Sequence, residues 1–505
     1  MGISSWLTAG VCRLLLSLAG APVEGGAAPP ALPEDPEITG PILIPSELDD
    51  AEGLPPGTPT VRLGQAVAMA LEHNFSILGS ADAVQSARLR EGASRAQFYP
   101  KITPVFRRGL ASNGGATSRT YSLEASQRVP WLGGTVNAAG NLTTQPQLDD
   151  PLRDRASEMQ LSLTQPLLRG FGPTATFADL TASRRARESQ ERSFVIARQG
   201  LAVEVASSFY EVLKQRQLLT VARQSFERNQ TLLHASRARM EAGLASKLDV
   251  YRAELQVSYA QDAMLSSETQ LTSALENFRV LLGLRPTDTV EPAVETFDED
   301  FAHELDPLPV LVQQALAHRL ELVESQAQVD DAVRNASLAR QNLLPQVDVT
   351  FGLTRRGFGP SFGDSLRTMD NRFDVFFSTS YPIERVGDRA QKAVAEIAVA
   401  AGRRALGQRQ LEIEAEVRAA VRNMDRISKS VELQKKGVEL ALQQHRLATL
   451  RYQRGIASNF DVVEAEDKLV SARAALVSLR TDHRVARVRL LKVTGTLDVE
   501  REFTR

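Results

Sequence analysis

The chain has 505 residues, of which 43% are hydrophobic, and its formal net charge at pH 7 is −2. This length allows several domains or one elongated body. The balanced charge, without a basic block interleaved with aromatic residues, argues against nucleic acid as a partner. Cys12 is the only cysteine, so an intrachain disulfide is impossible and cysteine-rich metal sites are excluded.

The start of the chain is typical of a leader. Residues 1–28 contain a short apolar run that ends in Ala19-Gly20-Ala21, the small-residue pattern of a signal-peptide cleavage site. The pattern is weak, so the true start, the cleavage position and lipidation of Cys12 stay open. Residues 29–60 are rich in proline, glycine and acids, which predicts a flexible segment. No later apolar run reaches about 18 residues, so any membrane contact would have to be made by strands.

The rest of the chain is an internal duplication. ALEHN, which begins at Ala70, returns as ALAHR at Ala315, and the segment around Pro100 returns around Pro345. The predicted organisation is a first repeat at 61–283, a connecting equatorial segment at 284–310, a second repeat at 311–495 and a tail at 496–505.

Each repeat opens with an Ala-rich helical pattern that ends at its proline. This predicts single helices of about 34 residues at 66–99 and 311–344. Strict alternation then predicts strands with one apolar and one polar face, as in the apolar set Val347, Val349, Phe351 and Leu353, and again in Phe373, Val375 and Phe377.

Long proline-free segments follow at 176–242 and 388–454. Each predicts a helix of about 67 residues, or about 100 Å. Apolar residues recur at every seventh position on both sides of the turn that ends each helix, which predicts a coiled-coil seam. The seam positions are Leu219, Phe226, Leu233, Met240, Val250, Val257, Met264, Leu271 and Phe278, then Val431, Val438, His445, Tyr452, Val462, Leu469, Leu476, His483 and Leu490.

Two seam positions of the second repeat are histidines. His445 and His483 stand where the first repeat has Leu233 and Leu271. We interpret them as packed histidines rather than metal ligands.

The same turn motif occurs twice, as GLASKLDV from Gly243 and GIASNFDV from Gly455. Each glycine is placed to end a helix, and Ser246 and Ser458 to cap the next. An aspartate three residues later, Asp249 or Asp461, would complete a capping box. The motif therefore predicts the tip of a long helical hairpin. The helix after each tip and the Ala-rich helix together match one long helix in length, so we expect them to stack end to end along it.

The ordered set of motifs resembles the TolC-like outer-membrane efflux proteins over roughly 60–495. The resemblance is carried by LGQAVAMALEHN and LPVLVQQALAHR, the helix-ending Pro100 and Pro345, LSLTQPLLRGFG and FSTSYPIERVG, and the two tip turns. It implies an α+β fold in which a long α-helical coiled-coil barrel joins a transmembrane β-barrel shared between protomers. It also implies a homotrimer in the outer membrane with a periplasmic helical extension, an adaptor protein and an inner-membrane pump, and efflux or type I secretion as the function.

The resemblance also implies site residues at the tips. It places Tyr452, Asp461, Glu464 and Asp249 at the periplasmic entrance, where threefold symmetry would make rings of like charge that favour cations. The alternative is that both aspartates are only capping residues and that Glu464 pairs with Lys468 one turn later. Adaptor docking would fall on the tip turns Gly243, Leu244, Ala245, Ser246, Gly455, Ile456, Ala457 and Ser458.

The strand region of the first repeat is longer than that of the second by about 33 residues. Residues 129–165 contain a second strand-end turn and an alternating run, which predicts an added β-hairpin and six strands per chain. The alternative is an irregular surface insertion. A closed barrel with an open lumen needs more strands than one chain supplies, so several chains would share it. We expect the polar positions Ser122, Glu124, Ser126, Gln160, Ser162 and Thr164 to face the lumen.

Other classes of protein fit less well. A periplasmic adaptor would carry one hairpin with β-rich domains, whereas this chain has two hairpins. An enzyme would need converging catalytic residues, and neither an HExxH motif nor a Gly-rich phosphate-binding loop is present. We expect no catalytic residues, cofactor or metal site. A non-channel coiled-coil scaffold is the remaining alternative, and the transported substrate is not readable.

Overall fold

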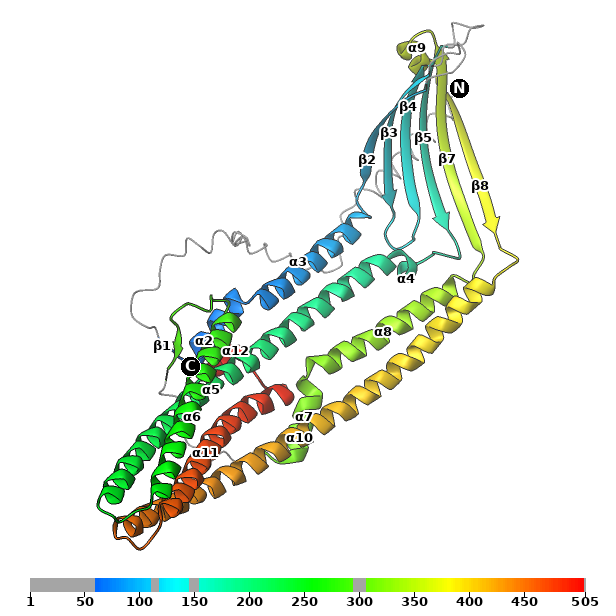
Figure 1. The fold of residues 1–505 in the computed structure, drawn as a ribbon. Helices are drawn as coiled ribbons and strands as arrows, with labels where there is room; N and C mark the ends of the chain where they lie inside the picture. The colour runs from blue at the N-terminus through cyan, green and yellow to red at the C-terminus, as the bar shows by residue number, and fades with distance from the viewer. Residues whose placement is uncertain (1–59, 110–117, 145–153, 294–305, 504–505) are drawn as a thin grey trace. The chain divides into compact units, whose positions relative to one another are not determined.

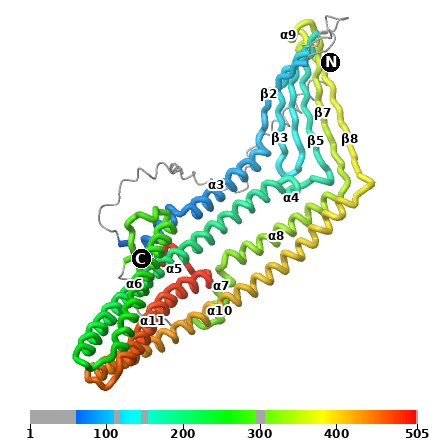
Figure 2. Tube along the Cα trace, in the orientation of Figure 1, coloured from blue at the N-terminus to red at the C-terminus, as the bar shows by residue number. Residues whose placement is uncertain are grey.

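The computed structural model describes residues 60–109, 118–144, 154–293 and 306–503. The predicted signal peptide, Cys12 and nearly all of the proline-rich segment lie outside these ranges. Figure 1 shows a strand region and a helix region, and Figure 2 follows the chain between them.

Six antiparallel strands form one open sheet in the order β2-β3-β4-β5-β7-β8. Four of the strands belong to the first repeat and two to the second. Their bounds are β2 Lys101–Arg108, β3 Arg119–Arg128, β4 Thr135–Thr144, β5 Arg155–Pro166, β7 Gln346–Gly359 and β8 Asp370–Ser380. The predicted added hairpin is therefore confirmed as β4 and β5.

The register gives the sheet one apolar face and one mostly polar face. Leu161 of β5 is opposite Leu353 of β7, which is opposite Phe373 of β8. Residues directly opposite each other on neighbouring strands point to the same side of a sheet, so these three share a face. Phe106, Leu123, Phe373 and Phe377 on this face are exposed in the single chain. The predicted polar positions lie together on the other face, where Glu124 is opposite Ala139 and Ala139 opposite Gln160.

The prediction of single helices of about 34 residues at 66–99 and 311–344 was wrong, because each of these helices is broken into two pieces. The first consists of α2 Leu63–His73 and α3 Phe75–Ala96, and the second of α7 Leu308–His318 and α8 Leu320–Gln341. The residues between the pieces, Asn74 and Arg319, have extended backbone with ψ of 122° and 119°.

Each break receives the end of a hairpin helix. Asn74 donates from Nδ2 to the carbonyl oxygen of Leu281 at 2.9 Å. Gly283 follows with φ of +79°, and a Cβ there would lie 2.5 Å from the His73 oxygen. In the second repeat, a Cβ on Gly495 would lie 3.1 Å from the His318 carbonyl carbon. The hairpin helix therefore ends at the break, so the predicted end-to-end stacking holds for the second piece of each broken helix, α3 or α8, and not for the whole predicted helix.

The long helices are confirmed within two residues at each end. They are α5 Ala178–Glu241, which continues through the tip into α6 Lys247–Leu281, and α10 Val386–Gln453, which continues into α11 Asn459–Val493. α5 packs against α6, α3 and α2, and α10 packs against α11, α8 and α7 (Figure 1). α5 also packs against α11, so the two hairpins contact each other.

The main core lies where α2 meets α5, α6 and the chain end. Val67, Phe209, Phe278 and Leu282 are buried there, with the rings of Phe209 and Phe278 6.0 Å apart. Shorter elements complete the fold: β1 Thr60–Val61 pairs in parallel with β6 Glu291–Pro292, and the short helices are α4 Pro173–Thr176, α9 Phe362–Arg367 and α12 Val499–Phe503. None of the helices in the described ranges is both long and apolar enough to cross a membrane.

Candidate functional site at the hairpin tips

The two tip turns have the same backbone geometry. Gly243 and Gly455 have φ of +71° and +74°, which a residue with a side chain rarely adopts. The amides of Leu244 and Ile456 bond back to the carbonyls of Arg239 and Arg451. These are the bonds of a Schellman motif, so each glycine ends its helix as predicted.

The predicted capping boxes are present at both tips. Ser246 caps α6, and Asp249 accepts from the Ser246 amide at 3.1 Å. Ser458 caps α11, and Asp461 accepts from the Ser458 amide at 2.7 Å. Hydrogen bonds from the Ser458 backbone and side chain lower the pKa of Asp461. Within one chain, both aspartates therefore act as helix caps.

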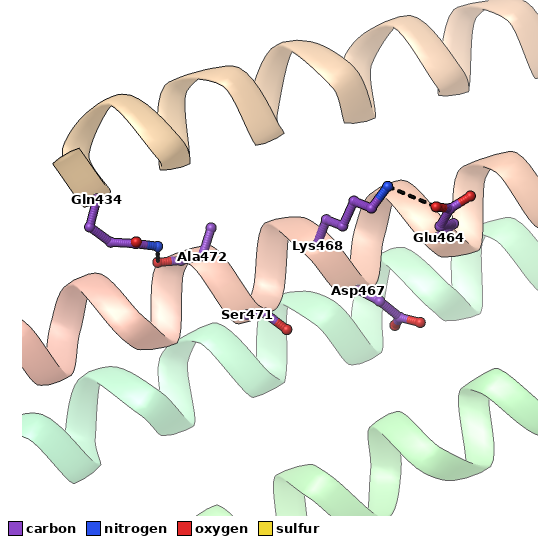
Figure 3. A pocket seen from close by; sticks show the side chains of 6 residues that line it. All are labelled: Gln434, Glu464, Asp467, Lys468, Ser471 and Ala472. Atoms are coloured by element: carbon purple, nitrogen blue, oxygen red, sulfur yellow. Dashed lines mark hydrogen bonds and ion pairs between the residues drawn. The ribbon is translucent and has the colours of Figure 1, made fainter.

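Glu464 pairs with Lys468 on the surface of α11, where Nζ lies 2.7 Å from Oε1. Figure 3 shows this pair beside an open groove whose far wall carries Gln434 of α10. Asp467 and Ser471 of α11 also line this groove, and in the view of Figure 3 their side chains point away from that of Lys468. In the first hairpin, Arg252 takes the place of Glu464 and lies 4.0 Å from Asp249.

Tyr452 is buried and joins the two hairpins near the tips. Its hydroxyl lies 3.1 Å from Oγ of Ser236 on α5, and the Arg239 guanidinium stacks 4.6 Å from its ring centre. Arg239 also donates to the Tyr452 carbonyl oxygen. Asn459 adds a second link, donating to the Asp249 carbonyl oxygen at 2.8 Å.

A buried carboxylate lies farther along α11. Glu466 is only 2% exposed. Arg228 of α5 donates from Nε to both of its oxygens at 2.9 Å, and Nε2 of His445 on α10 lies 3.1 Å from Oε2. Burial alone would raise the pKa of Glu466, but the hydrogen bonds from His445 and Arg228 and the Arg228 charge outweigh it and lower this pKa to about 2.

The next residue, Asp467, faces the first hairpin from another side. It accepts from Nε2 of Gln256 on α6 at 2.8 Å. Burial, and then the charge of Glu466, raise the pKa of Asp467 against the opposing effect of this hydrogen bond. The neighbouring pair Glu466 and Asp467 thus contacts α5, α6 and α10 from α11.

The structure brings together three of the four predicted entrance residues, because Tyr452, Asp461 and Asp249 lie at adjoining tips, whereas Glu464 lies on the exposed surface of α11. His483 is buried, as predicted for a packed histidine. His445 lies in the seam but its Nε2 also contacts the Glu466 carboxylate at 3.1 Å, which the packed interpretation missed. Arg228, Ser236, Asn459 and Glu466 were missed altogether. Among the described residues, no group of histidine, cysteine or acidic side chains is placed to hold a metal ion.

Comparison with known proteins gives a consistent result. The family model "Outer membrane efflux protein" matches residues 66–284 and 311–496. The chain is 23% identical over 322 residues to outer membrane protein TolC of Vibrio cholerae, covering 63% of this chain and 72% of that protein. It is 22% identical over 359 residues to TolC of Escherichia coli, covering 69% and 71%.

A solved structure extends the likeness to the fold. The open state of the Neisseria gonorrhoeae MtrE outer membrane channel matches with a TM-score of 0.65 at 17% identity, covering 86% of this chain and 91% of that one.

Each of the two repeats contributes one helical hairpin, and both repeats contribute strands to one amphipathic antiparallel sheet. This architecture is that of outer-membrane channel proteins with a periplasmic helical domain. Since the family model covers both repeats, this chain belongs to the outer membrane efflux protein family. The protein is a non-enzymatic outer-membrane efflux channel.

Proposed function

We propose that three copies of this chain form the exit duct of a tripartite efflux pump or type I secretion system. A periplasmic adaptor would dock at the hairpin tips and connect the duct to an inner-membrane pump. The observation that carries this proposal is the open six-stranded sheet with an exposed apolar face.

A single copy leaves this sheet incomplete. In the described residues, β2 and β8 are edge strands with no strand partner on their outer sides. Unpaired strand edges and unsatisfied backbone groups are not tolerated against lipid, so the sheet must close. Three copies supply 18 strands, a number that leaves an aqueous channel. Because β2 and β8 run in opposite directions, β8 of one copy can pair antiparallel with β2 of the next.

The two faces of the sheet suit lipid outside and water inside. The apolar face would carry Phe106, Leu123 and Phe373 toward lipid. The polar face would line the lumen with Ser122, Glu124, Ser126, Gln160, Ser162 and Thr164, the set expected from the sequence. Arg356 lies 3.7 Å from Glu158 on this face, which balances part of the lumen charge.

The entrance constriction is assigned to Asp461 and Glu464, with Tyr452 as a buried support and Asp249 as the weaker member. Two observations support this: the hydrogen bonds from Ser458 lower the pKa of Asp461, which favours its charged form, and the Glu464 side chain is exposed enough to face a symmetry mate. Arg252 lies beside Asp249, so a ring at the first tip would be mixed in sign.

The adaptor-docking surface is assigned to the eight residues of the two tip turns, 243–246 and 455–458. Leu244 and Ile456 are 71% and 66% exposed, which is high for large apolar side chains. Exposed apolar side chains on a rigid turn are typical of a protein-binding surface.

A non-channel scaffold is the alternative function, and reconstitution separates the two. The full-length protein, purified in detergent, is expected to have the mass of three copies and to conduct ions in planar bilayers in proportion to the trimer present. A monomer, or a trimer without conductance, would contradict the channel and favour the scaffold.

A further inference from the structure

Glu254 and Glu466 are the same residue at the same distance from the two tip turns, but their environments differ. Glu254 is five residues after the cap residue Asp249, and Glu466 is five after Asp461. The Glu254 side chain is 42% exposed and pairs with Arg237 of its own hairpin at 2.6 Å. The Glu466 side chain is 3% exposed and bonds to a helix of the other hairpin.

The substitution that accompanies this difference lies on α10. His445 faces Glu466, whereas Leu233 holds the corresponding place in the first repeat. Replacing an apolar seam residue with histidine provides a second polar partner for the carboxylate, so the second hairpin can bury a charge that the first leaves in water. The buried charge is then available to Arg228 of α5.

We propose that Glu466 is a positioning residue, an ionic clamp that holds the second hairpin against the first and thereby fixes Asp461 and Glu464 at the entrance. The clamp consists of Glu466, Arg228 and His445, with Asp467 and Gln256 as an adjoining link to α6. It rests on the proposed function only in so far as the tips form the entrance.

The position of the clamp makes this role physically reasonable. Glu466 lies about 3 Å along the helix from Glu464 and about 8 Å from Asp461 at 1.5 Å per residue. Between the clamp and the tip, the hairpins touch through a small cluster of Leu232, Tyr452 and Val462. The hydrogen bonds of Tyr452 and Asn459 described above add to this contact. Removing the charge from Glu466 would therefore leave the tip of α11 held by this cluster and these hydrogen bonds, without an ion pair to α5.

A buried ion pair is not in itself evidence of stabilisation, because the cost of desolvating its charges opposes their attraction. The role assigned to Glu466 is therefore to hold the second hairpin in position against the first, and not to raise the stability of the whole molecule. If Glu466 only adds to global stability, its neutralisation should affect the whole molecule alike. If it clamps the hairpins, the effect should concentrate at the tip.

Amide hydrogen exchange of the full-length protein in detergent distinguishes these cases. Glu466→Gln keeps the size and removes the charge, and Glu254→Gln is the matched control in the first hairpin. We expect Glu466→Gln to raise exchange about tenfold in 455–466, with the sheet unchanged, because a hydrogen bond to a charged group is lost. Glu254→Gln should change exchange in 243–254 less than about twofold. Equal effects of both variants, or a uniform rise along the chain, would overturn the clamp.

Replacing both Arg228 and Glu466 tests whether the change in amide exchange depends on the ion pair between the two hairpins. Arg228→Met alone leaves a buried carboxylate with a partner missing and should raise exchange at 455–466. The double variant Arg228→Met with Glu466→Met removes both charges, and should exchange more slowly than Arg228→Met alone or Glu466→Met alone. If the two single effects simply multiply in the double variant, the residues are not coupled and the proposal fails.

Single-channel recording then links the clamp to the entrance. Glu466→Gln is expected to raise the closed-state conductance severalfold, and Glu254→Gln to leave it unchanged. If the unmodified protein conducts but Glu466→Gln does not differ from it, the clamp does not position the entrance. If the unmodified protein does not conduct, the proposed channel fails, while the exchange experiment still decides whether the clamp exists.

Discussion

At the scale of single residues, the tips were the most predictable part of the site. Glycine at positive φ, serine as a cap and aspartate three residues later are local chemistry, so Gly455, Ser458 and Asp461 could be assigned from spacing alone. The contacts between hairpins could not be assigned, since Arg228 and Glu466 are far apart in the chain. One signal was available: a histidine at a seam position opposite a glutamate indicates a polar pair inside the seam.

Neutralising the entrance carboxylates tests their role without breaking the cap. Asp461→Asn with Glu464→Gln keeps the hydrogen-bond acceptors, so the turn should remain intact. We expect reduced block by divalent cations and a changed closed-state conductance in single-channel recordings, because the ring charge is removed. Asp425→Asn, from an exposed pair with Lys429 away from the tip, is the control. Conductance and block equal to the unmodified protein would show that the carboxylates are caps and surface charges only.

The clamp also has a predictable dependence on pH. The pKa of Glu466 is lowered from 4.5 to about 2, so its contribution to stability is complete above about pH 5 and is lost as the pH falls from 4.5 toward 2. Arg228, His445 and Asp467 are the charged or titratable groups that surround it. The melting temperature of Glu466→Gln should lie below that of the unmodified protein at pH 6, and the gap should narrow below pH 4. A gap that stays constant down to pH 3 would contradict this assignment.

At the scale of helices and strands, periodicity predicted most elements, because the two-residue alternation of the strands and the seven-residue repeat of the long helices are both strong here. Alternation in β7 and heptads in α5 and α10 identified these elements, and surplus length identified the hairpin β4–β5. The breaks at Asn74 and Arg319 could not be predicted, because neither residue is a strong helix breaker. They exist because the ends of α6 and α11 pack into them, and such packing has no signal in the sequence of the broken helix.

Glycine at the end of α6 should be required for this packing. Gly283→Ala places a Cβ 2.5 Å from the His73 oxygen on a residue with φ of +79°, so we expect a loss of about 2 kcal/mol or more in unfolding free energy. Gly92→Ala in α3 is the control, since no other side chain or segment lies within 4 Å of its Cβ position. This control should be neutral or stabilising by up to about 1 kcal/mol. Equal melting temperatures for the two variants would show that the break tolerates a side chain.

At the scale of the whole molecule, the duplication explains how one chain supplies both hairpins and both parts of the sheet. The repeats are not equivalent, because the first adds two strands and the second buries Glu466. The asymmetry in strands determines the barrel that three copies can form, and the asymmetry at Glu466 makes the second hairpin depend on the first. Sequence predicted the first asymmetry through length, but the second required the three-dimensional contacts.

The central claim is that three copies close one barrel through their edge strands, and cysteine cross-linking between β2 and β8 tests it most directly. In a Cys12→Ser background, one cysteine replaces Thr103 on β2 and a second is scanned over positions 372–378 on β8. We predict that oxidation in outer membranes yields covalent dimers and trimers at one or two neighbouring positions of the scan, and no larger species. A ladder that stops at two copies, continues beyond three, or never forms at any scanned position would contradict the shared 18-strand barrel.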